Sequence, residues 1–163
     1  MKKILYLLIG ILCLSGISCG YKCCDVPGPM NFIRAQKNGS AWEIDNSVGR
    51  IKLDSLILAD TSVNPQRTEL LAFKLKFNGA DTYALGPANV VYAYVPGMDN
   101  SYAYYTLDAG YANTFTVTYY NAGAGFVGGT FDIKLDKDPS NTDPRYPASV
   151  SFLSGSFSIH LSK

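Results

Sequence analysis

Apolar and polar residues alternate with a period of two through most of the chain after residue 31, and this pattern limits the possible folds most strongly. Near the C-terminus, Phe157, Ile159 and Leu161 alternate with Ser158 and His160. Successive side chains of a β-strand point to opposite faces, so the pattern predicts strands with one buried and one exposed face. The sequence shows no 3.6-residue apolar stripe of an amphipathic helix. We therefore expect an all-β fold with no substantial helix in the mature domain.

Clusters of Gly, Pro, Asn and Asp divide this alternation into separate strands. Strands are expected at residues 31–37, 40–45, 49–59, 69–77, 80–85, 89–95, 101–107, 113–120, 126–136 and 148–162. The connections are short, and the sequence shows no helix that could return the chain for parallel pairing. These features predict an antiparallel β-sandwich or flattened β-barrel with mostly meander connectivity and without parallel strand pairs.

The dipeptide Asn38-Gly39 predicts a two-residue type I′ hairpin turn, because both residues accept the positive φ angles of that turn. The resulting register pairs Ile33 with Ile44, Ala35 with Trp42 and Arg34 with Glu43. The first two pairs form an apolar face, and the third brings opposite charges together on the other face. A slip of one residue would exchange the two faces. Trp42 is accordingly expected in the core.

Three further irregularities are expected along the strands. Asn78-Gly79 is a second candidate hairpin turn, and it would place Lys76 opposite Asp81. The apolar pattern changes phase at Ser154-Gly155, which indicates a bulge that bends the last strand. Residues 49–59 are expected to form a single strand with an irregularity near Asp54-Ser55.

The first 18 residues are organised like a secretory signal, with a basic start, an apolar run from Ile4 to Leu14, and small residues before Cys19. The run is shorter than the roughly 20 residues that span a bilayer. Ser18-Cys19 resembles the lipobox of bacterial lipoproteins, with Gly16 in place of the usual Leu-like residue. The resemblance implies that Cys19 is acylated and becomes the first residue of the mature chain.

The chain is therefore expected to contain a lipoprotein signal peptide (1–18), a lipidated cysteine with a flexible tether (19–30) and a single all-β domain (31–163). Several acyl chains on Cys19 would hold the protein on a membrane, which we expect to be the outer membrane of the cell envelope. Cys23 and Cys24 are neighbours without a distant cysteine to pair with, so no disulfide framework is predicted.

The charge of the mature chain is expected to be close to zero. The sequence has 14 basic and 13 acidic residues, and cleavage of the signal peptide would remove Lys2 and Lys3. This balance argues against a nucleic-acid partner, because such proteins neutralise phosphates with excess Lys and Arg. It also predicts no polybasic patch for lipid head groups. The covalent lipid is thus the expected link to the membrane.

Several short motifs are spread over the mature domain. Phe32, Asn38-Gly39 and Trp42 form an F…NG..W opening, and the segments 82–85, 129–131 and 155–157 follow it. Together they resemble the motifs of small uncharacterised envelope lipoproteins of Bacteroidota, although Asp81 stands where the first glycine of one motif is usual. The resemblance implies an envelope lipoprotein of β-sheet fold and brings no catalytic residues with it.

Few groups in the sequence could carry catalysis. His160, the only histidine, alternates with serines on the polar face of the last strand, and Asp132 and Asp136 flank Lys134 on another outward face. A nucleophilic serine requires an oriented histidine and a sharp turn at the serine, and the sequence shows no such turn. Paired catalytic carboxylates require a cleft, and the sequence indicates none. We expect no enzyme, no catalytic residue and no cofactor; a hydrolase that uses these groups is the second alternative.

One polar segment gathers oxygen ligands that suit calcium. These ligands are Asp136, Asp138, Asn141 and Asp143. The segment lacks the glycine and the closing glutamate of an EF-hand loop, and its prolines restrict wrapping around an ion. A polar hairpin loop is the simpler interpretation.

Tyrosine is concentrated in one part of the chain, since nine of the 12 tyrosines lie between Tyr83 and Tyr120. A tyrosine ring stacks on sugars and proteins, but tyrosine also forms half-buried strands well. The candidate contact residues are Tyr92, Tyr94, Tyr102, Tyr104 and Tyr105. We expect a non-catalytic binding or structural domain that contacts a glycan or a protein; the first alternative is a lipocalin-like carrier of a small apolar ligand.

Overall fold

The computed structural model describes residues 31–45, 47–60, 69–94 and 102–162, which form one sheet of 11 strands. The strands are β1 Phe32–Lys37, β2 Ser40–Asp45, β3 Ser47–Lys52, β4 Ser55–Asp60, β5 Glu69–Lys76, β6 Thr82–Ala84, β7 Val90–Tyr94, β8 Ala103–Leu107, β9 Thr114–Asn121, β10 Phe126–Lys137 and β11 Ser149–Ser162. One 3-10 turn, η1 Pro87–Asn89, precedes β7. The all-β prediction is confirmed. The segments expected to be the signal peptide and tether, with Cys19, Cys23 and Cys24, lie outside the described residues.

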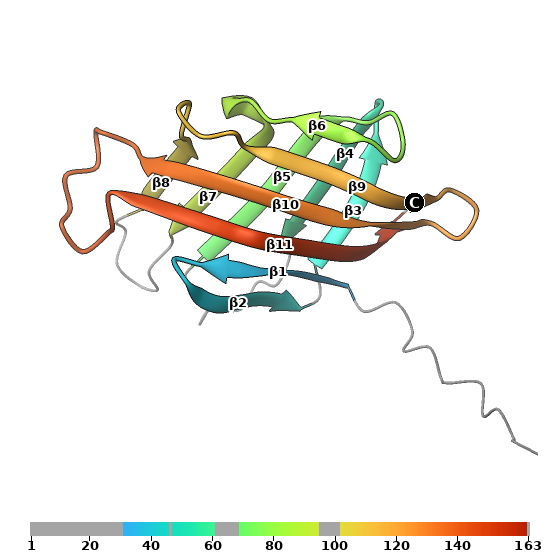
Figure 1. Cartoon of the computed structure of the whole chain (residues 1–163), viewed down its shortest axis with the longest axis horizontal. Helices are drawn as coiled ribbons and strands as arrows, with labels where there is room; N and C mark the ends of the chain where they lie inside the picture. The colour runs from blue at the N-terminus through green and yellow to red at the C-terminus, as the bar shows by residue number, and fades with distance from the viewer. Residues whose placement is uncertain (1–30, 46, 61–68, 95–101, 163) are drawn as a thin grey trace, which may run out of the picture.

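Seven strands close a flattened barrel, in the order β11–β3–β4–β5–β7–β8–β10 and back to β11. The β1–β2 hairpin is attached to the other edge of β11, and β9 with β6 extends beyond β10. In Figure 1, β6, β9, β10 and β11 run across the view, and β3, β4, β5, β7 and β8 cross them steeply. The predicted sandwich or flattened barrel is therefore present, with consecutive strands mostly paired as in a meander.

One strand pair is parallel, contrary to expectation. The end of β11 runs parallel to β3, with Leu161 beside Gly49 and Ser162 beside Arg50. Gly49 makes this close approach possible, because a Cβ atom there would lie 2.8 Å from a methyl group of Ile159. The prediction considered local crossover connections only. Here the whole meander carries the chain around the barrel, so the last strand meets the third without a crossover helix.

The first hairpin has the predicted register, with Ile33 opposite Ile44, Ala35 opposite Trp42 and Arg34 opposite Glu43. Asn38 and Gly39 have φ angles of 49° and 82°, as a type I′ turn requires. The expected charge pair is not formed, because the Arg34 guanidinium turns to β11 and donates from Nε to Ser156 Oγ at 3.0 Å. Trp42 is half-buried rather than fully in the core.

Two turns differ from the prediction. Leu53 and Asp54 form a two-residue turn between β3 and β4, so residues 49–59 are two paired strands. Asn78-Gly79 does not close a hairpin, because β5 pairs with β4 and β7, whereas β6 pairs with β9 in the other layer. The Tyr83 hydroxyl stabilises this crossing by donating to the Gly79 carbonyl at 2.7 Å.

The predicted bulge in the last strand is confirmed. Ser154 has a φ of 50°, and the register of β11 against β10 shifts at this point. The next residue is a glycine, Gly155, because the Phe131 ring covers this position and a Cβ atom there would lie 2.6 Å from the ring. The bulge lets β11 bend around the core while its apolar side chains stay inside.

Aromatic rings from both layers meet in the interior. The Phe73 ring of β5 lies 5.0 Å from the rings of both Phe115 on β9 and Phe131 on β10. Ile33 and Ile159 are fully buried and belong to the same core. Within the described residues there is no helix that is long and apolar enough to cross a membrane.

Candidate functional site

The strand alternation divides the five candidate tyrosines between two faces of the sheet. Tyr92 and Tyr105 point inward and are only 1% and 3% exposed, with their ring centroids 5.2 Å apart. Burial raises the pKa of both hydroxyls, and the negative charge of Glu69 raises them further. The prediction placed these two residues on a contact surface, but their strand positions make them core residues.

Tyr102 and Tyr104 are the members of the set that face solvent. They are 48% and 55% exposed, respectively. Their rings are nearly parallel, with an interplanar angle of 26° and centroids 6.4 Å apart. Tyr104 lies opposite Ala93 of β7, which is buried. The two rings form an exposed aromatic surface, which we call the tyrosine pair.

The loop between β10 and β11 lies directly beside the tyrosine pair. The Asp138 amide donates to the Tyr104 carbonyl at 2.9 Å, and Asn141 Nδ2 donates to the Tyr102 carbonyl at 2.7 Å. These bonds join the polar loop to the backbone that carries the two rings. The arrangement thus combines flat apolar faces with hydrogen-bonding groups, as carbohydrate-binding surfaces require.

The oxygen atoms proposed as metal ligands have other partners in this loop. Asp138 Oδ1 accepts from the Ser140 amide at 2.8 Å. Hydrogen bonding by the Ser140 side chain, followed by its backbone, lowers the pKa of the Asp138 carboxyl. Asp143 pairs with Arg145 at 2.7 Å, and this contact likewise lowers its pKa. Asp136, at the end of β10, is exposed. The described part of the chain contains no group of three or more acidic, histidine or cysteine side chains placed to hold a metal ion.

Tyr94 belongs to a cluster that the sequence analysis missed. Glu69 on β5 pairs with the Lys37 ammonium and accepts from Trp42 Nε1 at 2.9 Å. Tyr94 and Tyr92 flank the ammonium, with ring centroids 5.8 Å and 5.5 Å from Nζ. The cluster ties the β1–β2 hairpin to the opposite layer. One signal was available, because Lys37 continues the inward-facing series of Ile33 and Ala35.

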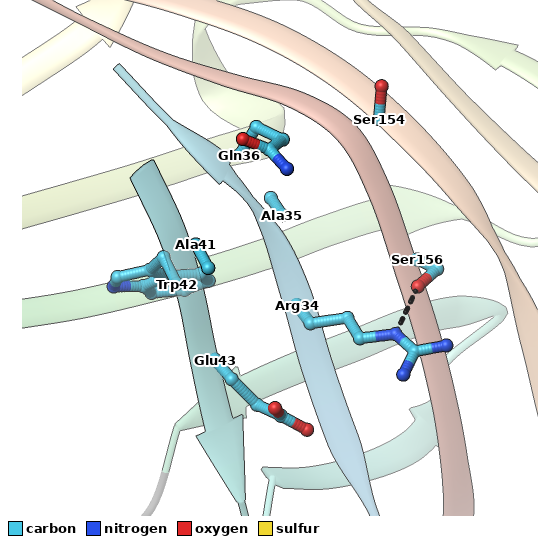
Figure 2. Close-up of a pocket in the computed structure, with 8 residues that line it drawn as sticks. All are labelled: Arg34, Ala35, Gln36, Ala41, Trp42, Glu43, Ser154 and Ser156. Atoms are coloured by element: carbon cyan, nitrogen blue, oxygen red, sulfur yellow. Dashed lines mark hydrogen bonds between the residues drawn. The ribbon is translucent and has the colours of Figure 1, made fainter. Parts of the chain in front are cut away.

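An open hollow of about 490 Å³ lies between the β1–β2 hairpin and the bulge of β11, and Figure 2 shows residues that line it. It is lined by Arg34, Ala35, Gln36, Ala41, Trp42, Glu43, Ser154 and Ser156. Arg34 extends toward Ser156 and away from Glu43, so the hollow presents a cation and an anion separately. This surface has the chemistry to hydrogen-bond a polar ligand.

The candidate catalytic groups make separate structural contacts. The His160 ring lies edge-on to Phe126 at 5.8 Å, next to the turn at Gly125. Asp132 Oδ1 accepts from the Ser154 amide at 2.6 Å and thereby holds the bulge of β11. The Lys134 ammonium lies over the Tyr111 ring at 4.5 Å. Each of these three side chains therefore has a structural contact with a neighbouring residue of the sheet.

Comparison with known proteins finds no similar protein. No family model, no curated protein and no solved structure matches the chain. The function must therefore be inferred from the site geometry, in which the tyrosine pair and its polar loop are the feature best suited to binding.

Proposed function

We propose that the chain is an envelope lipoprotein, anchored through Cys19, whose β-domain binds carbohydrate at the tyrosine pair. The observation that carries the proposal is the exposure of two nearly parallel rings beside a fixed polar loop. Two adjacent exposed aromatic side chains form an apolar patch, and such patches are more informative about binding than single exposed residues.

The chemistry of the surface suits a sugar. The apolar face of a pyranose ring stacks on an aromatic ring, and its hydroxyl groups require hydrogen-bonding partners at the edge. The loop between β10 and β11 carries carboxylates at Asp138 and Asp143 and hydroxyl groups at Ser140 and Thr142. It is joined to the backbone of the tyrosine pair through the Asp138 amide and Asn141 Nδ2. With centroids 6.4 Å apart, the two rings lie within reach of one oligosaccharide.

The alternatives from the sequence receive less support. A carrier requires an interior cavity, but Phe73 on one layer contacts Phe115 and Phe131 on the other across the centre of the barrel. A hydrolase requires converging acidic groups, but Asp132 and His160 have separate structural contacts. The tyrosine pair is therefore the better basis for a functional proposal.

A glycan array provides the test, with the mature domain and a Tyr102→Ala/Tyr104→Ala variant as probes. Two stacking contacts of about 1 kcal/mol each predict a loss of affinity of roughly 30-fold. Tyr119→Ala is the matched control, because Tyr119 is 53% exposed on β9, away from the loop. Binding that survives the double substitution, or that falls equally in the control, would contradict the proposal.

A further inference from the structure

The turn between β3 and β4 is made from residues that such turns normally avoid. Leu53 and Asp54 have φ angles of 49° and 56°, a region that favours Asn and Gly and is uncommon for leucine. The same protein uses Asn38-Gly39 for its other turn of this length. The Leu53 side chain is also 90% exposed. A residue that is unfavourable in both conformation and solvation indicates a role other than folding.

Four cations surround the base of this turn on the outer face of the sheet. Strand pairing places Ser55 between Lys52 and Lys76, and Ile57 between Arg50 and Lys74. A hollow of about 310 Å³ is lined by Arg50, Lys52, Leu53, Ser55, Ile57 and Lys74. All four cationic side chains are exposed. We call Leu53 and these four cations the basic tip.

The cations of the basic tip are not neutralised locally. The ion pairs seen in the described part of the chain are those of Lys37 and Arg145, and the four tip cations take part in neither. Asp54 is the acidic residue within the turn, so the tip carries a net positive charge. The near-neutral charge predicted no polybasic patch, but the sheet brings together cations from β3 and β5 on either side of β4.

We propose that the basic tip binds the surface of an anionic lipid membrane. Leu53 would enter the interfacial region, and the four cations would contact the phosphate groups around it. A soluble polyanion would account for the cations but not for the exposed leucine, and an apolar partner would account only for the leucine. The combination of the two favours a lipid surface.

The position of the tip makes this contact separate from the acyl anchor. In Figure 1 the β3–β4 turn lies at the upper edge of the molecule, whereas β1 begins at the lower edge. The tip would therefore hold the domain at a second point. A second attachment in the same molecule strengthens membrane binding, because its binding becomes an intramolecular event.

Vesicle co-sedimentation of residues 25–163, without the acyl chain, isolates the contribution of the tip. This segment contains every strand of the closed sheet. Binding is expected to vesicles that contain phosphatidylglycerol and to be much weaker with phosphatidylcholine alone. It should also fall at about 1 M salt, where the screening length is only about 3 Å.

Two variants separate the apolar and the ionic contributions. Leu53→Asn should lower the vesicle partition coefficient by about tenfold or more, because it removes a large apolar side chain. The double variant Lys52→Gln/Lys74→Gln should lower the same coefficient by about 25-fold, which is about fivefold for each charge removed. Leu53→Asn should also raise the melting temperature, because asparagine accepts a positive φ. Weaker binding by a more stable protein cannot result from unfolding.

Arg34→Gln/Lys134→Gln is the charge-matched control, because it removes two cations from β1 and β10. It should change vesicle binding by less than about twofold. Equal losses in the two double variants would overturn the proposal in favour of a net-charge effect. Unchanged vesicle binding by Leu53→Asn, together with tight binding of soluble polyphosphate, would overturn it in favour of a soluble polyanion.

Discussion

Gly129→Ala should strongly destabilise the protein, whereas the same substitution at the neighbouring Gly128 should not. A Cβ atom on Gly129 would lie 2.0 Å from the Thr116 carbonyl oxygen and 2.8 Å from the Phe157 ring. The register of β9 against β10 shifts between Gly128 and Gly129, and this irregularity brings the two backbones close together. A backbone carbonyl cannot rotate out of the way, so β9 itself would have to move.

The size of the effect follows from the contacts. Overpacking of a core usually costs 1–3 kcal/mol, and a clash with backbone belongs at the upper end, so we expect about 3 kcal/mol for Gly129→Ala. In a domain of this size that loss lowers the melting temperature by about 10 °C. A Cβ atom on Gly128 would lie 3.4 Å from the nearest atom, the Phe157 carbonyl oxygen. Its replacement should change the free energy of unfolding by less than about 1 kcal/mol.

Urea unfolding followed by the fluorescence of Trp42 measures both variants. The ring of Trp42 lies 4.8 Å from that of Phe152, so unfolding changes its surroundings. The two unfolding curves should share one slope and differ in midpoint. Equal midpoints for the two variants would show that β9 yields easily at this position, and would refute the reasoning.

Two further predictions concern alkaline stability and lipidation. Burial, followed by the charge of Glu69, raises the pKa of the Tyr92 hydroxyl, so the folded protein keeps this phenol neutral. Its stability should fall as the pH rises above about 10, where the tyrosine of the unfolded chain ionises. Tyr92→Phe should reduce this loss in urea titrations at pH 9 to 11, and an unchanged pH profile would contradict the argument. Cells fed labelled palmitate should label the protein but not its Cys19→Ser variant, and equal labelling of both would exclude Cys19 as the acylated residue.

Predictions that depended on neighbouring residues succeeded where the local turn chemistry was strong. The Asn38-Gly39 hairpin and the bulge at Ser154-Gly155 were placed correctly, because positive φ angles and a phase change are local signals. Leu53-Asp54 was missed because its residues are unusual for its turn. Asn78-Gly79 has suitable residues, but pairing of β6 with the other layer overrode them.

The alternation of apolar and polar residues was sufficient by itself to determine the all-β fold and the buried face of most strands. It could not determine which strands lie next to one another. That arrangement decides the parallel contact of β3 with β11, the burial of Tyr92 beside the exposed Tyr104, and the convergence of Arg50 and Lys74 in the basic tip. The physical reason is that alternation is a property of one strand, whereas lateral contacts depend on closure of the barrel, which joins segments far apart in the chain.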